Sequence, residues 1–396
     1  METYSKKIYI RTLSIIALLF FIVGFSLGIN SIVIPFIRQS LELSTAESYM
    51  VLTATYSIFV VCGYPSSLLL KKYGYKKTML LSFLFFLIGM YLFVPSAKSQ
   101  SFALFLLASI ILGIGNAVLQ AAINPYITLL GNIDSAATRI SIMGIINKVA
   151  WAVAPIFLGI FFNLTDAQLL TMIKPFYLIV IFIAICLFLI FIVPIPEIHA
   201  DGEVEDNKVY SIRNLVKYPH LTLGCLALFC DIGLETLSMA SIVDYAIYNN
   251  LSNPQLFTSY TVIAMIIGYS LGIILIPKYI TQEKALKVCS IMGLIASGLI
   301  IIVPGKISIL FLASLGLANS LLWPTIWPLA LKDLGSLTKL GSSLLVMGIV
   351  GGAIVPLIFG YFCDILNNMQ FAYAICIPLY MIIYYYSIKG YKIRPV

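Results

Sequence analysis

The chain has 396 residues, of which 61% are hydrophobic and only 10% charged, and its formal net charge is +8. Soluble domains carry roughly 25% charged residues, so this composition excludes an ordinary soluble protein. The net charge does not indicate nucleic-acid binding, because the basic residues are spread over short loops between long apolar stretches. The sequence therefore predicts an integral membrane protein in contact with the lipid bilayer and no nucleic-acid partner.

Twelve apolar stretches are each long enough to cross a hydrocarbon core of ~30 Å, which takes about 20 helical residues. Lipid offers no partner to an exposed backbone amide, so each stretch is predicted to be helical and the fold all-α. The predicted spans are residues 10–36, 46–70, 78–96, 101–131, 136–162, 172–194, 218–248, 255–277, 284–304, 307–331, 340–363 and 369–388.

The basic residues divide unequally between the two sides of the predicted membrane. Of the 24 Lys and Arg residues, 19 fall in the tails and loops on the side of the N-terminus, and Lys148 lies within a span. The excess marks the cytoplasmic side, so both termini are predicted to be cytoplasmic and the location to be the plasma membrane, or the inner membrane in a bacterium. The four on the opposite side are Arg38, Lys98, Lys174 and Lys306.

No catalytic or metal-binding pattern stands out in the sequence. The first apolar stretch is too long for a cleavable signal and is read as a retained helix. No glycine loop precedes a Lys-Ser/Thr pair, and the two His residues lie at the central polar stretch, so we expect neither an enzyme nor a cofactor. The seven cysteines lack ligand spacing and are predicted to be free, buried thiols.

A single strongly polar stretch, residues 195–217, divides the chain into two sets of six spans. Its acidic cluster and its Pro, Gly and Asn residues are typical of a flexible linker. We therefore predict an N-terminal half at 1–194, a cytoplasmic linker at 195–217 and a C-terminal half at 218–396.

The two halves repeat each other in register. Span four reads GNAVLQAAINPY and span ten ANSLLWPTIWPL, each with Asn followed nine residues later by Pro. Span five contains PIFLGIF and span eleven PLIFGYF, and the loops KYGYKK and KYITQEK also align. The three offsets are 203, 201 and 206 residues. Such a parallel repeat of six spans is the pattern of major facilitator transporters.

Several stretches resemble the fucose permease and glucose/galactose transporter family of the major facilitator superfamily. The similar stretches are LQAAINPYITLLG, ATRISIMGIIN, ALFCDIGLETLSMASIVDY, NSLLWPTIWPLALKDLG and GSSLLVMGIVGGAIVPLIFGYFCD. The resemblance implies the major facilitator fold and transport of a sugar, with Asn30 and Asn147 at Asn positions of the family and Glu235 at an acidic one.

Three polar positions depart from the family pattern. Ser31 stands where proton-coupled fucose permease has Asp, Gln120 where the family usually has Glu, and Gly144 where it has Gln. These positions are associated with sugar or proton handling, so the particular substrate and the coupling ion stay open.

Polar side chains inside spans are costly, so a functional role is the first hypothesis for each of them. Asn116, Gln120 and Asn124 are spaced i, i+4, i+8 in span four and share one helical face. Amides both donate and accept hydrogen bonds, as sugar hydroxyls require, and we predict that these three bind substrate. The alternative is a seam of hydrogen bonds between helices, with Asn124 satisfying backbone groups freed by Pro125.

Span ten carries Asn319, Trp323 and Trp327 at the same spacing. An indole face stacks on the apolar face of a pyranose, so Asn319 and Trp323 are predicted to bind substrate. Trp residues also gather at the membrane interface, which is the alternative for Trp323 and the favoured interpretation for Trp327.

Span seven carries Asp231 and Glu235 one turn apart. Two carboxylates at i, i+4 repel each other, and in a low dielectric one is expected to hold a proton, which suits proton coupling. The alternative is neutralisation by a cation such as Lys148, which we also assign to coupling. Asp244, near the outer end of span seven, is expected to be solvated.

These observations predict a secondary active transporter that carries a monosaccharide or sugar derivative by alternating access at a midplane site, with proton symport favoured over facilitated diffusion and over another cation. One alternative is a carrier of an amino sugar, organic anion or drug-like molecule, with Lys148 binding the anion. Another is a sugar sensor of the same fold that does not transport. The oligomeric state is open, and a monomer suffices.

Overall fold

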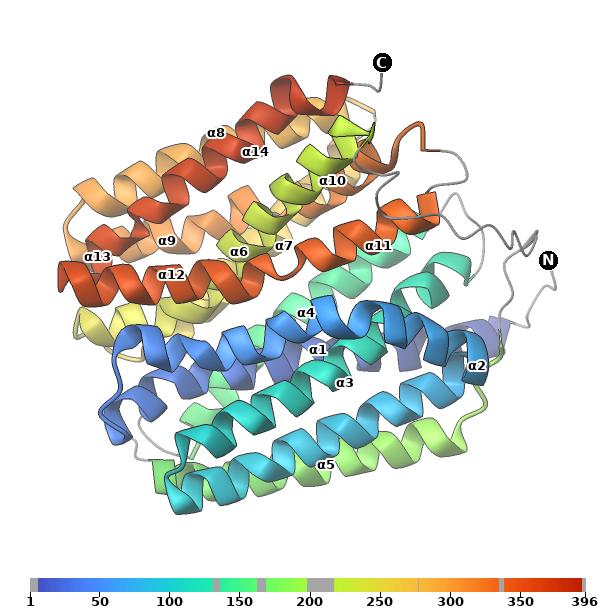
Figure 1. Ribbon diagram of the computed structural model, residues 1–396, viewed down its shortest axis with the longest axis horizontal. Coiled ribbons are helices and arrows are strands. Elements are labelled where there is room, and N and C mark those ends of the chain that lie inside the picture. Colours follow the sequence, from blue (N-terminus) through green and yellow to red (C-terminus); the bar gives the residue numbers. More distant parts are fainter. Residues whose placement is uncertain are drawn as a thin grey trace. The chain divides into compact units, whose positions relative to one another are not determined.

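The computed structural model describes residues 6–130, 136–161, 169–197, 217–276, 278–334 and 338–393. Over these ranges the chain is helical without strands (Figure 1). Twelve of its helical segments are long and apolar enough to cross a membrane, which confirms the predicted number of spans. The fold is therefore that of an all-α, multi-pass membrane protein.

The first six spans occupy five long helices. Helix α2 contains both span two and span three, as two helices joined at a kink at Gly74, whose φ of 75° is not helical and suits a residue without Cβ. A short 3₁₀ turn, Leu169–Met172, precedes the last helix of this set. The helices are α1 (Lys6–Ser40), α2 (Thr45–Ser99), α3 (Phe102–Leu129), α4 (Ala136–Gly159) and α5 (Ile173–Ile192).

Spans ten and eleven are each broken near their middle. The ring of Pro324 would clash with the carbonyl of residue 320, so the helix stops at Asn319 and restarts at Leu322. In span eleven the backbone bonds shorten to a three-residue step at 349–353, beside three glycines of low helix propensity. The helices are α6 (Pro219–Tyr248), α7 (Leu256–Leu275), α8 (Gln282–Ile302), α9 (Gly305–Asn319), α10 (Leu322–Leu331), α11 (Thr338–Gly348), α12 (Gly351–Leu366), α13 (Met369–Ala372) and α14 (Cys376–Ile388).

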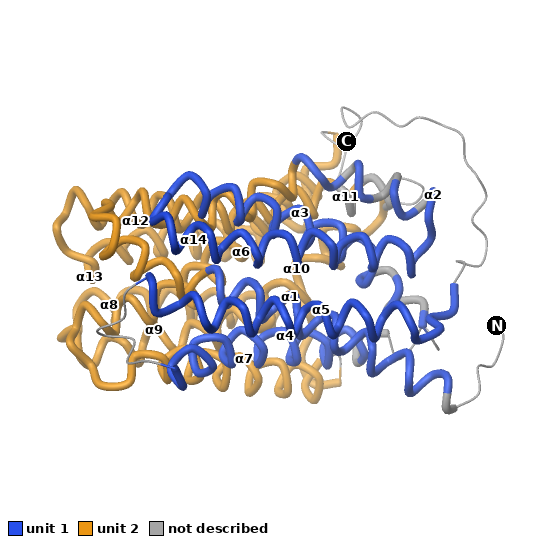
Figure 2. The backbone as a smooth tube through the Cα atoms, turned by 90° about the horizontal axis from the view of Figure 1, so that it is seen from below, with its two compact units in different colours: residues 1–30, 61–206 blue, residues 31–60, 207–396 orange. Residues whose placement is uncertain are grey.

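Close contacts divide the chain into two compact units (Figure 2). Unit 1 comprises Met1–Asn30 and Val61–Asp206, and unit 2 comprises Ser31–Val60 and Asn207–Val396. The end of α1 and the beginning of α2 thus pack with helices of the second half of the sequence. Most of the predicted linker, residues 198–216, lies outside the described residues, and the boundaries 1–194 and 218–396 of the sequence repeat stay a prediction.

In unit 1, α1 crosses α4 at two glycines. A Cβ on Gly24 would collide with the carbonyl oxygen of Asn147, and one on Gly28 would lie 2.7 Å from the carbonyl oxygen of Trp151. Backbones can come this close only where one helix lacks a side chain, which is how small residues drive helix packing in membranes.

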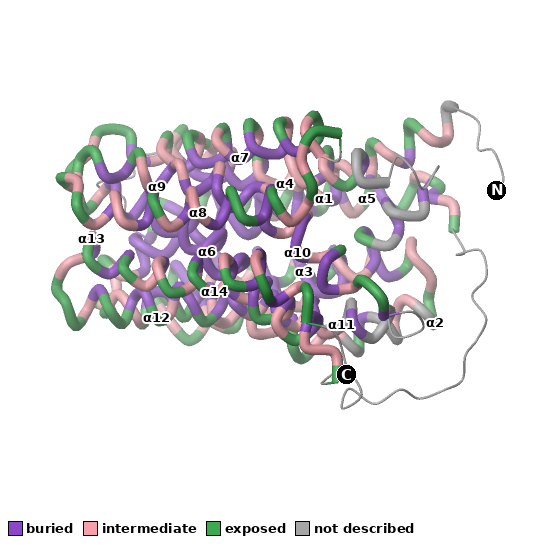
Figure 3. Tube along the Cα trace, turned by 90° about the horizontal axis from the view of Figure 1, so that it is seen from above, coloured by how far each residue is buried: buried purple, intermediate pink, exposed green. Residues whose placement is uncertain are grey.

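In unit 2, α6 is the central helix and is buried along most of its length (Figure 3). It crosses α12 as closely as α1 crosses α4. A Cβ on Gly351 would collide with the carbonyl oxygen of Phe229, and one on Gly233 would collide with the Val355 side chain. Helix α6 therefore has two close contacts with α12, one between backbones at Gly351 and one between Gly233 and the Val355 side chain.

The two crossings occupy equivalent places in the sequence repeat. Gly24 and Phe229 are 205 residues apart, and their partners Asn147 and Gly351 are 204 residues apart. In unit 1 the glycine is Gly24 on α1, the first helix of the pair, whereas in unit 2 it is Gly351 on α12, the second helix of the pair. One glycine on either helix is enough for the two backbones to approach closely, so the two repeats have the same helix crossing with the glycine on opposite partners.

Gly351→Ala is expected to destabilise the protein by about 1–3 kcal/mol, the usual cost of an extra methyl group in a packed core. The reason is that the new Cβ would push α12 away from the Phe229 carbonyl. Thermal melting of the purified protein measures the effect. Gly298→Ala is the matched control, because a Cβ there meets nothing within 4 Å. Equal melting temperatures for the two variants would contradict the prediction.

Candidate functional site

In unit 1, two predicted substrate residues join α1 to α3 through hydrogen bonds. The Ser109 hydroxyl donates to Asn30 Oδ1 over 3.1 Å. The Asn116 amide donates to the Ser26 hydroxyl over 3.4 Å and to the Leu112 carbonyl over 3.2 Å. Both Asn side chains are 0% exposed. These contacts are those of the alternative interpretation, a polar seam between helices, and the substrate role of Asn30 and Asn116 stays a prediction.

Burial falls along the amide stripe of α3. Asn116 is fully buried, Gln120 is partly exposed and Asn124 is exposed. The spacing places the three on one face, as expected, but only the last two have surface through which they could contact a ligand. Among the amides of this stripe, the structure therefore favours Gln120 and Asn124 as ligand-binding groups.

Asn147 and Lys148 lie beside the crossing of α1 and α4. The Asn147 amide donates to the Phe20 carbonyl of α1 over 3.0 Å. Lys148 Nζ lies 5.9 Å from the centre of the Trp151 ring, within the range of a cation–π interaction. Both side chains are partly exposed. Asn147 thus supports helix packing with one donor and retains surface for a ligand.

In unit 2, Asn319 connects three helices. Its amide donates to the Ser238 hydroxyl of α6 over 3.4 Å, and its carbonyl oxygen accepts from the Tyr380 hydroxyl of α14 over 2.5 Å. This is the counterpart of Asn116 in unit 1, since in each unit the Asn of the fourth span of the set donates to a Ser of the first. The substrate role predicted for Asn319 stays a prediction, although its polar atoms already have protein partners.

Trp323 and Trp327 stack on each other on α10, with ring centres 5.0 Å apart and planes 19° apart. Both are partly exposed. Because the two indole rings stack nearly parallel, a ligand that contacts Trp323 also lies close to Trp327. A binding function proposed for Trp323 therefore includes Trp327, for which the sequence alone favoured a place at the membrane interface. The pair forms a rigid aromatic surface of the kind that covers the apolar face of a sugar ring.

Three acids lie on α6. Asp231 is 0% exposed and Glu235 is 8% exposed. Both are within electrostatic range of the Tyr269 hydroxyl of α7. Asp244 was expected to be solvated, and this is wrong: it is 1% exposed and forms an ion pair with Arg38. The partner is 206 residues away in the sequence, so spacing could not reveal it.

Sequence reasoning did not select Ser238 and Tyr380, which form hydrogen bonds with Asn319, or Tyr269, which lies within electrostatic range of Asp231 and Glu235. The sequence could have indicated the two tyrosines, because a Tyr hydroxyl in the middle of an apolar span needs a buried hydrogen-bond partner. Which partner it finds depends on the packing of α6, α7, α9 and α14.

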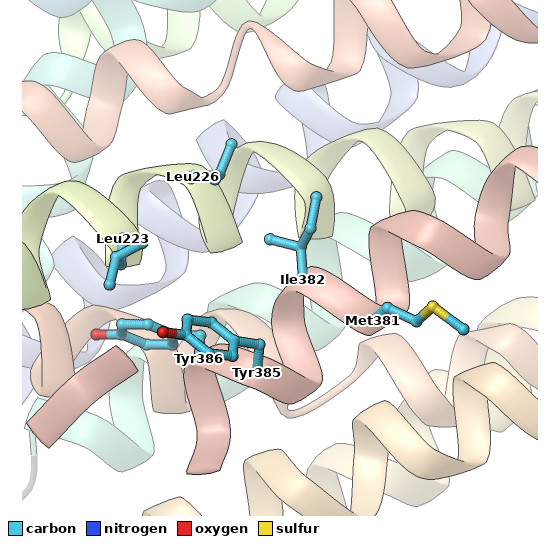
Figure 4. A pocket seen from close by; sticks show the side chains of 6 residues that line it. All are labelled: Leu223, Leu226, Met381, Ile382, Tyr385 and Tyr386. Carbon is cyan, nitrogen blue, oxygen red and sulfur yellow. The ribbon is translucent and has the colours of Figure 1, made fainter. Parts of the chain in front are cut away.

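A pocket of about 360 Å³ opens between α6 and α14 (Figure 4). Sugar sites need several convergent polar groups, and this lining is almost wholly aliphatic and aromatic. It is therefore not our candidate for substrate binding. The lining residues are Leu223, Leu226, Met381, Ile382, Tyr385 and Tyr386.

In the described part of the chain, twelve helical segments long and apolar enough to cross a membrane define a multi-pass membrane protein, with buried polar seams inside each unit. The model of the Major Facilitator Superfamily matches residues 16–347 of this chain. The chain belongs to the Major Facilitator Superfamily, and its homologues are transporters and not enzymes.

Curated relatives align along nearly the whole chain. The glucose/galactose transporter of Brucella abortus biovar 1 (strain 9-941) is 31% identical, over 99% of this chain and 97% of its own length. The L-fucose-proton symporter of Escherichia coli (strain K12) is 25% identical, over 97% and 94%. These relatives confirm the family that the sequence motifs resembled.

Solved structures share the fold. The crystal structure of the transporter FucP in the outward conformation superposes with a TM-score of 0.72 at 23% identity, covering 96% of this chain and 98% of that one. A bacterial homologue of the human lysosomal transporter Spinster, in an inward-facing and occupied conformation, gives a TM-score of 0.68 at 14% identity, covering 98% and 96%. At these identities the similarity concerns the fold.

Proposed function

We propose that this protein carries a monosaccharide or a close derivative across a membrane by alternating access, as a proton symporter. The observation that carries the proposal is the 31% identity, over 99% of the chain, to a protein named a glucose/galactose transporter. The membrane is the plasma membrane, or the inner membrane in a bacterium. Both tails face the cytoplasm, as the excess of Lys and Arg in the loops on their side supports.

Each unit offers its own groups for a sugar. In unit 1 these are the partly exposed Gln120 and the exposed Asn124 of the α3 amide stripe, whose amides can pair with hydroxyls as donor and acceptor. In unit 2 they are the stacked indoles of Trp323 and Trp327. Asn116 and Asn319 support the site indirectly by positioning helices, because their hydrogen bonds hold α3 to α1 and α9 to α6.

Proton coupling is assigned to the acids of α6. Another relative is named an L-fucose-proton symporter, which supports coupling. The resemblance to the fucose permease family, however, implies acids at the positions of Ser31 and Gln120. Glu235 is buried one helical turn from Ser238, which belongs to the polar seam with Asn319, and Asp231 is buried one turn further along α6. A carboxyl in a low dielectric exchanges its proton readily when its surroundings change, which is what a coupling group needs.

Uptake of radiolabelled glucose, galactose and fucose by proteoliposomes, with and without a pH gradient, tests the proposal. At least one sugar should enter, and a gradient that is acidic outside should raise its accumulation. Uptake that ignores the gradient would remove proton symport from the proposal. Absence of both uptake and counterflow for all three sugars would remove the substrate class.

A pair of variants on α3 separates ligand binding from helix packing. Gln120→Ala is expected to raise KM about 2–12-fold with little loss of stability, since about 0.5–1.5 kcal/mol is the usual net value of a neutral hydrogen bond. Asn116→Ala should instead lower the melting temperature, because the hydrogen bond from its amide to Ser26, which joins α3 to α1, is lost. The reverse pattern, a stability loss at Gln120 and a KM change at Asn116, would contradict this division.

A further inference from the structure

The pocket between α6 and α14 lies near the end of unit 2 at which α6 begins and α14 ends. Leu226 is seven residues after Pro219, the first residue of α6, and Met381 is seven residues before Ile388, the last residue of α14. Seven helical residues rise by about 10 Å, so the pocket occupies the outermost ~10 Å of both helices. Figure 4 shows Leu223 and the two tyrosine rings at one end of the pocket and Met381 at the other.

The open side of this pocket is apolar and belongs to membrane spans. Leu226, Met381 and Tyr385 are 44%, 56% and 47% exposed, although each lies within a span. An apolar hollow does not hold water, so in a bilayer its natural filling is hydrocarbon. Its volume of about 360 Å³ falls within the range of about 300–1,000 Å³ that is usual for ligand pockets. Part of an acyl chain therefore fits this hollow.

A lysine continues the exposed face of α14 beyond the pocket. Met381, Tyr385 and Lys389 are spaced i, i+4, i+8, and all three are exposed. The backbone N–H of Lys389 still donates to the Tyr385 carbonyl over 3.0 Å, so the helical spacing holds up to the lysine. Lys389 thus follows the pocket by one turn, on the side where the chain leaves the membrane.

Three further lysines gather at the same end of unit 2. Lys217 is two residues before the start of α6. His220 Nε2 donates to the Lys332 carbonyl over 2.9 Å, which keeps Lys332 beside the first turn of α6. Lys392 ends the short 3₁₀ helix Gly390–Lys392, which packs against α6. All of these lysines are exposed, and clusters of four or more at a membrane surface attract anionic lipid headgroups.

This basic cluster is only partly neutralised. Glu283, in the first turn of α8, lies within electrostatic range of Lys332 and Lys392. Among the described residues, no acid forms an ion pair with Lys217 or Lys389. These two lysines are therefore the better candidates for binding a phosphate at the mouth of the pocket.

We propose that the pocket between α6 and α14 binds one anionic phospholipid, with an acyl chain in the apolar hollow and the phosphate within reach of Lys217 and Lys389. Ordinary lipid contact requires neither a hollow nor a basic rim. Here the two occur together, at the depth at which a chain joins its headgroup. A zwitterionic headgroup would add an amine beside the lysines and gain less from them. The proposal does not depend on which solute the protein carries.

Native mass spectrometry of the full-length protein in detergent, titrated with lipid, tests the proposal. Phosphatidylglycerol and phosphatidylcholine with identical acyl chains serve as probes. We expect one phosphatidylglycerol to bind about 25-fold more tightly than phosphatidylcholine, at about fivefold for each of two lysines. Phosphatidylglycerol with a photoreactive group in its acyl chain should crosslink to peptides from the first turns of α6 and the last turns of α14.

Two variants separate the headgroup from the chain. Lys217→Gln with Lys389→Gln should lower the affinity for phosphatidylglycerol about 25-fold and leave that for phosphatidylcholine unchanged. Leu226→Trp fills the hollow, and it should weaken both lipids about tenfold, the equivalent of about two methylene groups no longer buried. The matched controls are Lys174→Gln with Lys306→Gln, at loops predicted for the opposite side, and Leu271→Trp on α7, where Leu271 is 45% exposed.

Several outcomes would overturn the proposal. These are equal affinities for the two lipids, crosslinks spread over all spans, and a double lysine variant that binds phosphatidylglycerol as the wild type does. Crosslinks from the hollow to another copy of the chain would assign it to a dimer contact instead. The lysine variants change only exposed side chains, so they keep the test decisive even if Leu226→Trp does not fold. The readout needs no sugar, and a failure of all sugar uptake would leave it standing.

Discussion

Arg38→Ala is expected to destabilise the protein by about 3–5 kcal/mol, the usual cost of removing one partner from a buried ion pair. The loss does not measure the value of the pair. It arises because Asp244, at 1% exposure, loses the guanidinium that offsets the desolvation of its carboxylate. The melting temperature of the purified protein should fall by several degrees.

The double variant Arg38→Leu/Asp244→Leu provides the control for this prediction. It removes both charges and fills the space with apolar side chains, so it should melt well above the single variant and near the wild type. Arg38→Lys should fall between wild type and Arg38→Ala, since it keeps the charge and loses the second parallel bond. A single variant as stable as the double one would show that Asp244 is not desolvated in the folded protein.

The number and type of the spans could be predicted because a single physical requirement decides them. Lipid forces every backbone amide to bond within its own segment, so an apolar stretch of sufficient length must be a helix. The helix breaks inside spans ten and eleven were harder to predict from the sequence. Pro324 predicts where α9 must end, but the glycines around 349–350 allow a break without requiring one.

The sequence predicted which polar residues share a helical face, but it did not predict how deeply each of them is buried. The i, i+4, i+8 spacing correctly aligns Asn116, Gln120 and Asn124, yet burial falls from complete to exposed along these two turns. Depth depends on which helix packs against each position, and here α1 covers Asn116 through Ser26. Whether a polar group in a span serves packing or binding is therefore a tertiary property.

The partners of Asp244 and Asp364 lay beyond sequence reasoning for a related reason: Asp244 pairs with Arg38, and Asp364 accepts from the backbone N–H groups of Thr45 and Ala46. Asp244 and Asp364 each stand near the end of a span, where solvation is the ordinary expectation for an acid. Their partners are 206 and about 320 residues away, and no pattern of period 3.6 connects them. A parallel repeat indicates which spans correspond, but it does not indicate which residues of different spans meet.

Glu235→Gln is expected to abolish accumulation driven by a pH gradient while leaving sugar counterflow. A gradient of one pH unit stores about 1.4 kcal/mol per proton, enough for about tenfold accumulation at one proton per sugar. Glutamine keeps the size and hydrogen bonding of the side chain but cannot carry a proton. Proteoliposome uptake with and without the gradient, followed by counterflow at equal pH, measures the two quantities separately.

Asp231→Asn distinguishes which acid of α6 carries the proton. Glu235 retains 8% of its surface, whereas Asp231 retains none, so protons reach Glu235 more directly and its variant should have the larger effect. Glu235→Asp should restore part of the accumulation, because the carboxyl is shorter but still ionisable, and exposed Glu42→Gln should behave as wild type. If Glu235→Gln still accumulates sugar tenfold across one pH unit, α6 does not carry the proton through this residue, and coupling must lie with Asp231 or outside this helix.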